Sequence, residues 1–336
     1  MNASRIEASN PSEIALRGDF KYLRTLYYRV EDTTFFMYYK DQNKYSFNPL
    51  IGAIEIHESL KSLRLILSRK KNKLLQSIQR SLKNHQKVFL GVSFFTTQIW
   101  EMRDLIKKIR EKFKDRVFII GGGPHPSGDP KGTLRLGVDV VVVGEGEETL
   151  CMLLENVIED RDLGSVKGIA YMRDDDIIFT GKRKPIDLDD YPPFPIKNKN
   201  IGPIEITRGC PYLCYFCQTP HISGTKPRHR SLESILKYVR YLKQDGLTDI
   251  RFITPNAFSY GSKDGKEINP DKIEKLLVSV KREIGPRGKI YFGSFPSEVR
   301  PEHVNERTLG LVLDHASNDN LIIGAQSGSP RMLEAC

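Results

Sequence analysis

Short apolar runs alternate with segments of helical spacing along most of this sequence, and this alternation limits the fold more than any other feature. In the first half the runs are residues 34–39, 63–67, 88–93, 117–120 and 138–143. One helical segment between them carries Ile99, Met102, Ile106, Ile109 and Phe113 on one side. Nearly continuous apolar strands separated by helices are typical of a parallel sheet covered on both faces. We therefore predict a doubly wound, Rossmann-like α/β domain whose strand-end loops line a ligand crevice.

The second half repeats the alternation. A short extended run at residues 203–207 is followed by helical spacing that begins after Ser231, a typical cap, and ends at Gly246. A second helix opens at Asn269-Pro270 and ends at Gly285. Further strands are predicted at residues 249–253, 289–292 and 321–323. These repeats predict a parallel sheet or a TIM-type barrel, with its active residues at the carboxyl ends of the strands.

Three cysteines, Cys210, Cys214 and Cys217, lie just after the first strand of this second half. Three thiolates on a four-iron cluster leave one iron open to bind a substrate, so the triplet indicates an enzyme. A zinc site is the alternative, but neither His221 nor His229 completes a familiar zinc spacing. A disulfide framework fits poorly, because the chain has five cysteines in 336 residues and no secretory signal. We interpret Cys151 as a buried helical residue.

The Cys-x3-Cys-x2-Cys spacing, with Phe216 before the last cysteine, resembles the radical S-adenosylmethionine (SAM) superfamily. The resemblance implies that the cysteines hold a [4Fe-4S] cluster whose fourth iron binds SAM. Reduction would then cleave SAM to a 5′-deoxyadenosyl radical. Phe216 would sit beside the adenine, and the strand-end loops resemble the methylthiotransferase branch, which implies SAM contacts by Asn256, Ser294 and Gln326. The Gly-Gly-Glu element common in the superfamily is absent.

Two glycine-rich loops follow strands of the first half, at residues 121–126 and 144–149. Together with the loop at residues 93–98, they resemble the cobalamin-binding domain that often precedes a radical SAM barrel. The resemblance implies that a corrinoid contacts Ser93, Thr96, Gly122, Gly123, His125, Gly144, Glu145 and Gly146. The Asp-x-His-x-x-Gly motif that supplies a cobalt ligand is missing from residues 40–47. His125 is therefore expected to be a contact rather than a cobalt ligand.

These patterns divide the chain into four parts. We expect an N-terminal extension (residues 1–30), a B12-binding-like domain (31–165), a hairpin with a proline-rich linker (166–200) and a partial radical SAM barrel (201–336). Hairpin alternation spans residues 168–181, between the two domains. Four barrel strands are predicted where the family core usually has six, so the barrel is expected to be truncated.

Composition sets the remaining expectations. The net charge of +10 comes from basic residues that we interpret as spread along a solvated surface, although it raises the question of an RNA substrate. No apolar run could span a membrane, so a soluble chain is expected, and the few cysteines without a signal peptide favour a cytoplasmic location. The leading hypothesis is a radical SAM enzyme that cleaves SAM, with cobalamin relaying a methyl group to an unknown small molecule or RNA. A reductant such as ferredoxin or flavodoxin would supply electrons. The alternatives are a tRNA methylthiotransferase-like enzyme and a non-catalytic module that binds a cluster or corrinoid.

Overall fold

Seven strands form one sheet in the N-terminal part of the chain. A computed structural model describes residues 30–84 and 86–335. The strand order is β2-β1-β3-β4-β5-β6-β7, with β1 to β5 parallel and β6 and β7 antiparallel. The strands are β1 (Thr33–Tyr38), β2 (Arg64–Ser68), β3 (Lys87–Ser93), β4 (Val117–Gly122), β5 (Val140–Val142), β6 (Ile169–Arg173) and β7 (Asp176–Phe179). The predicted doubly wound sheet is confirmed, and its chain order reverses between β1 and β3.

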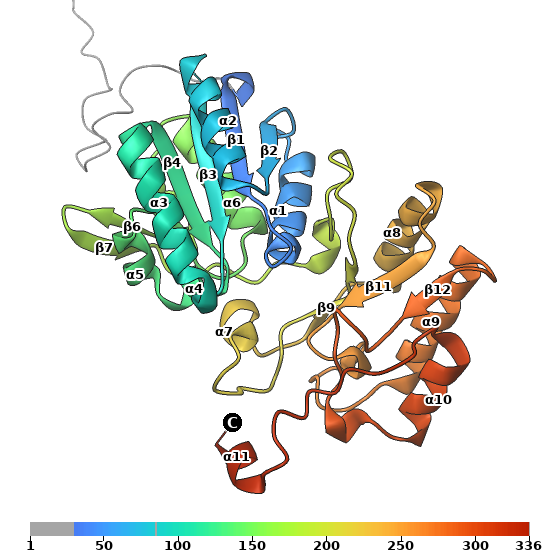
Figure 1. Cartoon of the computed structure of the whole chain (residues 1–336). Coiled ribbons are helices and arrows are strands. Elements are labelled where there is room, and N and C mark those ends of the chain that lie inside the picture. The colour runs from blue at the N-terminus through green and yellow to red at the C-terminus, as the bar shows by residue number, and fades with distance from the viewer. Residues whose placement is uncertain (1–29, 85, 336) are drawn as a thin grey trace, which may run out of the picture.

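Helices cover both faces of this sheet (Figure 1). They are α1 (Lys44–Ile56), α2 (Lys71–Lys83), α3 (Ile99–Phe113), α4 (Pro124–Gly128), α5 (Pro130–Arg135) and α6 (Glu147–Ile158). On one face, α1 and α6 pack against alternate strand residues such as Phe35, Phe89 and Phe118. On the other face, α2 and α3 pack against the intervening residues, among them Phe36 and Leu90. Alternate burial on both sides explains the nearly continuous apolar strands.

The hairpin at residues 168–181 exists but does not stand between the domains. β6 pairs with β5 in antiparallel register, so the hairpin extends the first sheet. Ile169 and Tyr171 add to the core beneath α1 and α6. The physical reason is that β5 would otherwise leave an open sheet edge with unpaired backbone groups.

The second half forms a smaller α/β unit around a parallel sheet of order β12-β11-β8. Its strands are β8 (Ile204–Glu205), β9 (Thr207–Arg208), β10 (Arg228–His229), β11 (Asp249–Ile253) and β12 (Lys289–Tyr291). Its helices are α7 (Thr219–Ser223), α8 (Leu232–Gln244), α9 (Pro270–Ile284), α10 (Glu306–His315) and α11 (Pro330–Glu334). β9 and β10 pair as a separate antiparallel ladder that brackets the cysteine segment. Apolar sides of α8 and α9 pack on the strands in one core.

The strand predicted at residues 321–323 is not formed. Ile323 makes only an isolated bridge with Val299, and the backbone at Ile322 pairs with Gly293 and Val299 rather than with β12. Ile322 and Ile323 remain 39% and 47% exposed. A buried parallel strand needs cover on both faces, and these two side chains do not have it.

The linker is tied to the first domain by one buried carboxylate. Glu55, at the end of α1, accepts hydrogen bonds from the backbone amides of Ile196, Lys197 and Asn198 at 2.7–3.0 Å. Three donors satisfy a carboxylate that would be costly to bury alone. The linker therefore enters β8 from a fixed point on the N-terminal domain.

Candidate functional site

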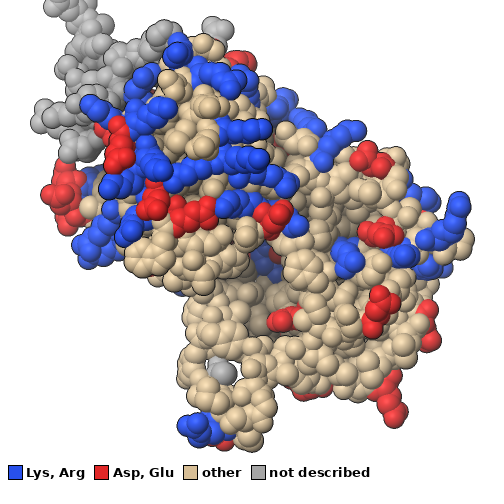
Figure 2. All heavy atoms as spheres, in the orientation of Figure 1, with Lys and Arg blue, Asp and Glu red and all other residues tan. Residues whose placement is uncertain are grey.

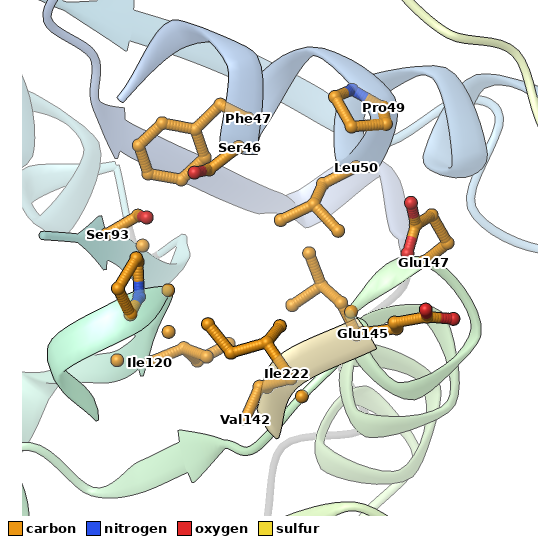
Figure 3. A pocket seen from close by; sticks show the side chains of 18 of the residues that line it. Ser46, Phe47, Pro49, Leu50, Ser93, Ile120, Val142, Glu145, Glu147 and Ile222 are labelled. Carbon is orange, nitrogen blue, oxygen red and sulfur yellow. The ribbon is translucent and has the colours of Figure 1, made fainter. Parts of the chain in front are cut away.

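A pocket lies at the carboxyl edge of the first sheet, where the chain order reverses between β1 and β3. Open α/β sheets bind ligands at such a switch point. The pocket contains about 850 Å³ of empty space, part of it open to solvent. Figure 3 shows side chains of α1, of the strand ends and of Ile222 from α7 surrounding one hollow. The wall is therefore built by both halves of the chain.

Glycines form one side of this pocket and leave room that any side chain would occupy. Around Gly122, a Cβ atom would find only Val142, at 3.9 Å. Gly123 has φ +88°, and a Cβ there would collide with the hydroxyl of Ser93. Ser93 itself is 4% exposed, and its Oγ has no hydrogen-bond partner within the described chain. An orphaned hydroxyl beside a glycine cradle suits a large ligand with polar groups, so these residues fit a corrinoid.

Six of the eight predicted corrinoid residues line the pocket. They are Ser93, Gly122, Gly123, Gly144, Glu145 and Gly146. Thr96 and His125 do not line it: the His125 ring stacks on Phe94, and its Nδ1 hydrogen bonds with Thr96 Oγ1 at 3.1 Å. The Nε2 of His125 is buried without a partner in the part of the chain described. The corrinoid contacts of all eight residues stay predictions.

Sequence reasoning missed several lining residues. Tyr45, Ser46 and Phe47 come from the start of α1, and Ile222 and Ser223 come from α7. The strand order alone would have indicated the first group, because the loop after β1 borders the switch point. No sequence signal marked the second group, since its position depends on how the two halves pack.

The cysteine segment is a loop closed by its own backbone. The amide of Cys210 donates to Gly224 O at 3.1 Å, and that of Cys217 donates to Cys214 O at 2.9 Å. Gly209 has φ +91°, and a Cβ there would meet the carbonyl of Lys226. Glycine is therefore required for the chain to enter the loop.

The three thiols are free and partly buried. Burial raises the pKa of Cys210; the Cys217 and Cys214 thiols raise it further, whereas Arg300 lowers it. Throughout the described residues, no three His, Cys, Asp or Glu side chains converge on a single-ion site. All ligands of a zinc ion approach it to about 2.0–2.3 Å, whereas each thiolate of a four-iron cluster binds its own iron. The donor set therefore fits a cluster better than zinc.

The four residues expected to contact SAM differ in exposure and in whether their polar groups already have hydrogen-bond partners. Phe216 is 59% exposed, and Gln326 is exposed with φ +61°. Ser294 is buried, and its Oγ lacks a partner among the described residues. The Asn256 amide is already engaged: its Nδ2 donates to His303 Nδ1 at 2.8 Å, and its Oδ1 accepts from the Arg300 amide at 3.4 Å. Asn256 thus joins two strand-end loops, and all four SAM contacts stay predictions.

Arg300 is a charged group that sequence reasoning did not single out. Its guanidinium lies 3.5 Å from the centre of the Tyr212 ring, inside the cysteine loop, and it pairs with Glu302. A cation over an aromatic face is attracted by the ring quadrupole. Arg300 therefore places a positive charge close enough to the cysteine loop to lower the pKa of Cys210.

Buried ion pairs connect the cysteine loop to the pocket. Arg208, two residues before Cys210, donates to Glu147 and to Glu205, each at 2.6 Å. Arg228, after the loop, pairs with Glu145. Burial alone would lower the pKa of Arg208, but the two carboxylates raise it well above its ordinary value. Glu145, predicted as a corrinoid contact, therefore also anchors the second domain.

Comparison with known proteins identifies both halves. Residues 66–154 match the B12 binding domain model, and residues 204–336 match that of the radical SAM superfamily. A candidate methylthiotransferase of Methanocaldococcus jannaschii is 32% identical over 70% of this chain and 50% of its own length. An uncharacterized methyltransferase of Pyrococcus horikoshii is 24% identical over 76% of this chain and 55% of its own. The chain spans about half the length of such curated relatives.

Two solved structures share the fold. The radical SAM methyltransferase TsrM from Kitasatospora setae, with cobalamin and a [4Fe-4S] cluster bound, superposes with TM-score 0.66 and 15% identity over 90% of this chain and 60% of TsrM. The cobalamin-dependent radical SAM enzyme OxsB superposes with TM-score 0.64 and 18% identity over 90% of this chain and 45% of OxsB. At these identities the likeness shows the two-domain fold.

Proposed function

Because the chain combines a B12-binding domain with a radical SAM domain, we propose that it acts as a cobalamin-dependent radical SAM methyltransferase. One observation carries the proposal. The helix that begins two residues after Cys217 supplies Ile222 and Ser223 to the wall of the switch-point pocket. The cysteine loop and the proposed corrinoid site thus share one short segment, as an enzyme that uses both cofactors on one substrate requires.

This chain's own residues have three tasks in the proposal. Cys210, Cys214 and Cys217 hold the cluster. Ser93, Glu145 and the glycines at positions 122, 123, 144 and 146 receive the corrinoid. Phe216, Asn256, Ser294 and Gln326 surround SAM, with Asn256 also positioning the Arg300 backbone. When bound, the reduced cluster supplies the electron that cleaves SAM, and cobalamin carries a methyl group.

The loop after β1 is not expected to ligate cobalt. Asn43 Nδ2 is directed inward, where it donates to the carbonyls of Tyr38 and Ser93 at 2.9 and 3.0 Å. The neighbouring pocket residues are Tyr45 and Ser46. A bound corrinoid would therefore receive no histidine ligand from this loop.

Two further features belong to the proposal. The cluster needs an external electron donor, for which a ferredoxin or flavodoxin is suitable. The four described cysteines are free thiols, which supports a reducing, cytoplasmic location. No helix of the described residues is long and apolar enough to cross a membrane.

A blocking substitution tests the corrinoid site without disturbing the fold. In Gly122→Leu the new Cβ has only Val142 within 4 Å, at 3.9 Å, and Gly122 lines the pocket that the added side chain is meant to fill. We expect anaerobically reconstituted G122L to retain its cluster and to lose the corrinoid absorbance that the wild type keeps after gel filtration. Gly310→Leu on α10, where an added Cβ meets nothing within 4 Å, is the matched control. Equal corrinoid retention by wild type and G122L would refute the pocket assignment.

A methylthiotransferase activity is the second candidate, favoured by the Methanocaldococcus relative. The first half of the sequence offers one cysteine, Cys151, which is buried, so an auxiliary cluster has no triplet there. Incubation with SAM and a reductant distinguishes a methyltransferase, a methylthiotransferase and a non-catalytic module. Formation of 5′-deoxyadenosine with cobalamin-dependent methyl transfer supports the first, sulfur insertion supports the second, and neither product indicates a non-catalytic module.

A further inference from the structure

One segment of the first domain carries a net positive charge as large as that of the whole chain. Residues 64–116 contain 15 basic and 4 acidic residues, a surplus of 11, whereas the whole chain has a surplus of 10. The remainder of the chain is therefore nearly neutral. Basic residues occur along the whole chain, as expected, but the surplus over acidic residues is confined to the segment from β2 to Arg116, just after α3.

The structure places this charge on one side of the molecule. α2 and α3 cover the same face of the sheet, and their outward sides carry exposed cations with no acidic partner among the described residues. These are Lys73, Arg80, Lys83, Lys108 and Lys112, which we call the basic face. Figure 2 shows Lys and Arg gathered over the N-terminal domain, whereas acidic and basic groups mix over the other domain.

The cations of the two helices act on one another. Burial lowers the pKa of Lys71 at the start of α2, and the charge of Lys108 on α3 lowers it further. Lys71 and Lys108 therefore repel one another, whereas Asp104 and Glu101 of α3 attract Lys71 and act against this repulsion. A surface that keeps like charges close attracts a polyanion, whose binding relieves the repulsion.

The only tryptophan of the chain lies at the edge of the basic face. Trp100, in the first turn of α3, is 65% exposed, and the Arg103 guanidinium stands 4.6 Å from its ring centre. Helical spacing puts Trp100 on the same side of α3 as Lys107 and Lys108. An exposed aromatic ring next to cations is the combination that holds an unpaired base against a phosphate backbone.

We propose that the basic face and Trp100 form a docking surface for folded RNA, with phosphates on the cations and an unpaired base on the tryptophan. An acidic protein fits less well, because protein interfaces need an apolar centre and α2 exposes no large apolar side chain. Duplex DNA fits less well, because its bases stay stacked. The proposal does not rest on the cofactor chemistry proposed above.

Intrinsic fluorescence tests it directly, because Trp100 is the sole tryptophan. The whole chain is titrated with an RNA stem-loop, a blunt DNA duplex of the same length and poly-L-glutamate. We expect the stem-loop to quench the fluorescence saturably, with an affinity that falls steeply with salt. No saturable quenching, or equal affinity for the duplex or the polypeptide, would overturn the proposal.

Matched variants locate the surface, with labelled RNA anisotropy as the readout. The triple variant K73E, R80E, K83E should bind about tenfold or more weakly, because three phosphate contacts are reversed. The control K237E, K275E, R282E makes the same charge change on α8 and α9 and should change affinity less than twofold. W100L should weaken binding and W100F should retain most of it. Equal losses in both triple variants would show non-specific attraction and reject the site, while unchanged circular dichroism establishes that each variant folds.

Discussion

The guanidinium of Arg208 donates a hydrogen bond to the carboxylate of Glu147 over 2.6 Å, although the residues lie 61 positions apart in different domains. Arg208 leads into the cysteine loop, and Glu147 opens α6 within the second glycine-rich loop. Their side chains are 11% and 3% exposed. This pair therefore fixes the cysteine loop against the segment that borders the switch-point pocket.

Breaking the pair should destabilise the protein strongly. In Arg208→Met the Glu147 carboxylate stays buried without its main partner, which costs about 3–5 kcal/mol of unfolding free energy. Arg240→Met is the control, because Arg240 pairs with Glu283 while 49% exposed, and should cost less than about 1 kcal/mol. Urea unfolding followed by circular dichroism measures both. Similar losses in the two variants would contradict a structural role for the buried pair.

The same pair predicts a loss of stability in acid. Burial alone would raise the pKa of Glu147, but Arg208 and Arg228 hold it below its ordinary value of 4.5. A lowered folded-state pKa contributes stability above the unfolded-state value, and this contribution disappears as pH falls through the folded-state pKa. The unfolding free energy of wild type minus that of Glu147→Gln should be constant above about pH 5.5 and shrink below about pH 4.5. A difference that stays constant down to pH 3.5 would exclude this linkage.

The cysteines should divide into two reactivity classes. Burial raises the pKa of Cys151 to about 12, so its thiol stays protonated and enclosed by α6 and the sheet. The thiols of Cys210, Cys214 and Cys217 are partly exposed. In cluster-free protein, iodoacetamide should modify the three loop cysteines within minutes and Cys151 only after denaturation, as peptide mass spectrometry reports. Rapid native labelling of Cys151 would count against its packed position.

Arg300 should tune the cluster potential. A positive charge over Tyr212 stabilises the reduced, more negative cluster, so Arg300→Gln should shift the midpoint potential to a more negative value. Arg300→Lys keeps the positive charge and should leave the midpoint potential close to that of the wild type. Arg173→Gln is the control, because Arg173 lies over Tyr171 on β6 in the other domain. Redox titrations monitored by electron paramagnetic resonance (EPR) give the potentials. Identical midpoints for wild type and R300Q would show that Arg300 is not electrostatically coupled to the cluster.

Local patterns predicted the secondary structure well because their causes are local. The helix after Ser231 begins there because Ser231 Oγ accepts from the Ser234 amide at 3.1 Å. β11 spans the predicted residues 249–253. The hairpin was found from alternation alone, but its pairing with β5 was not, since pairing depends on which sheet edge is open. The strand expected at residues 321–323 failed for the same reason: apolar residues become a strand only where neighbours cover them.

For the candidate site, too, the sequence predicted the locally determined parts and missed the contacts between the two domains. Cysteine spacing predicted the loop, and glycine clusters predicted one side of the pocket. Neither pattern could show that Ile222 closes that pocket or that Arg228 pairs with Glu145, because both contacts arise where the two domains pack. The basic face was missed because charge was judged for the whole chain rather than along α2 and α3.

The central claim is that the cluster and the corrinoid bind at adjoining sites of this one chain, and EPR tests it most directly. The chain is reconstituted anaerobically with iron, sulfide and cobalamin, and both centres are brought to their paramagnetic states. The account predicts a cobalt signal broadened by the neighbouring reduced cluster, with the broadening lost in Cys214→Ala. A cobalt signal that is identical with and without the reduced cluster, or a chain that retains no corrinoid, would contradict it.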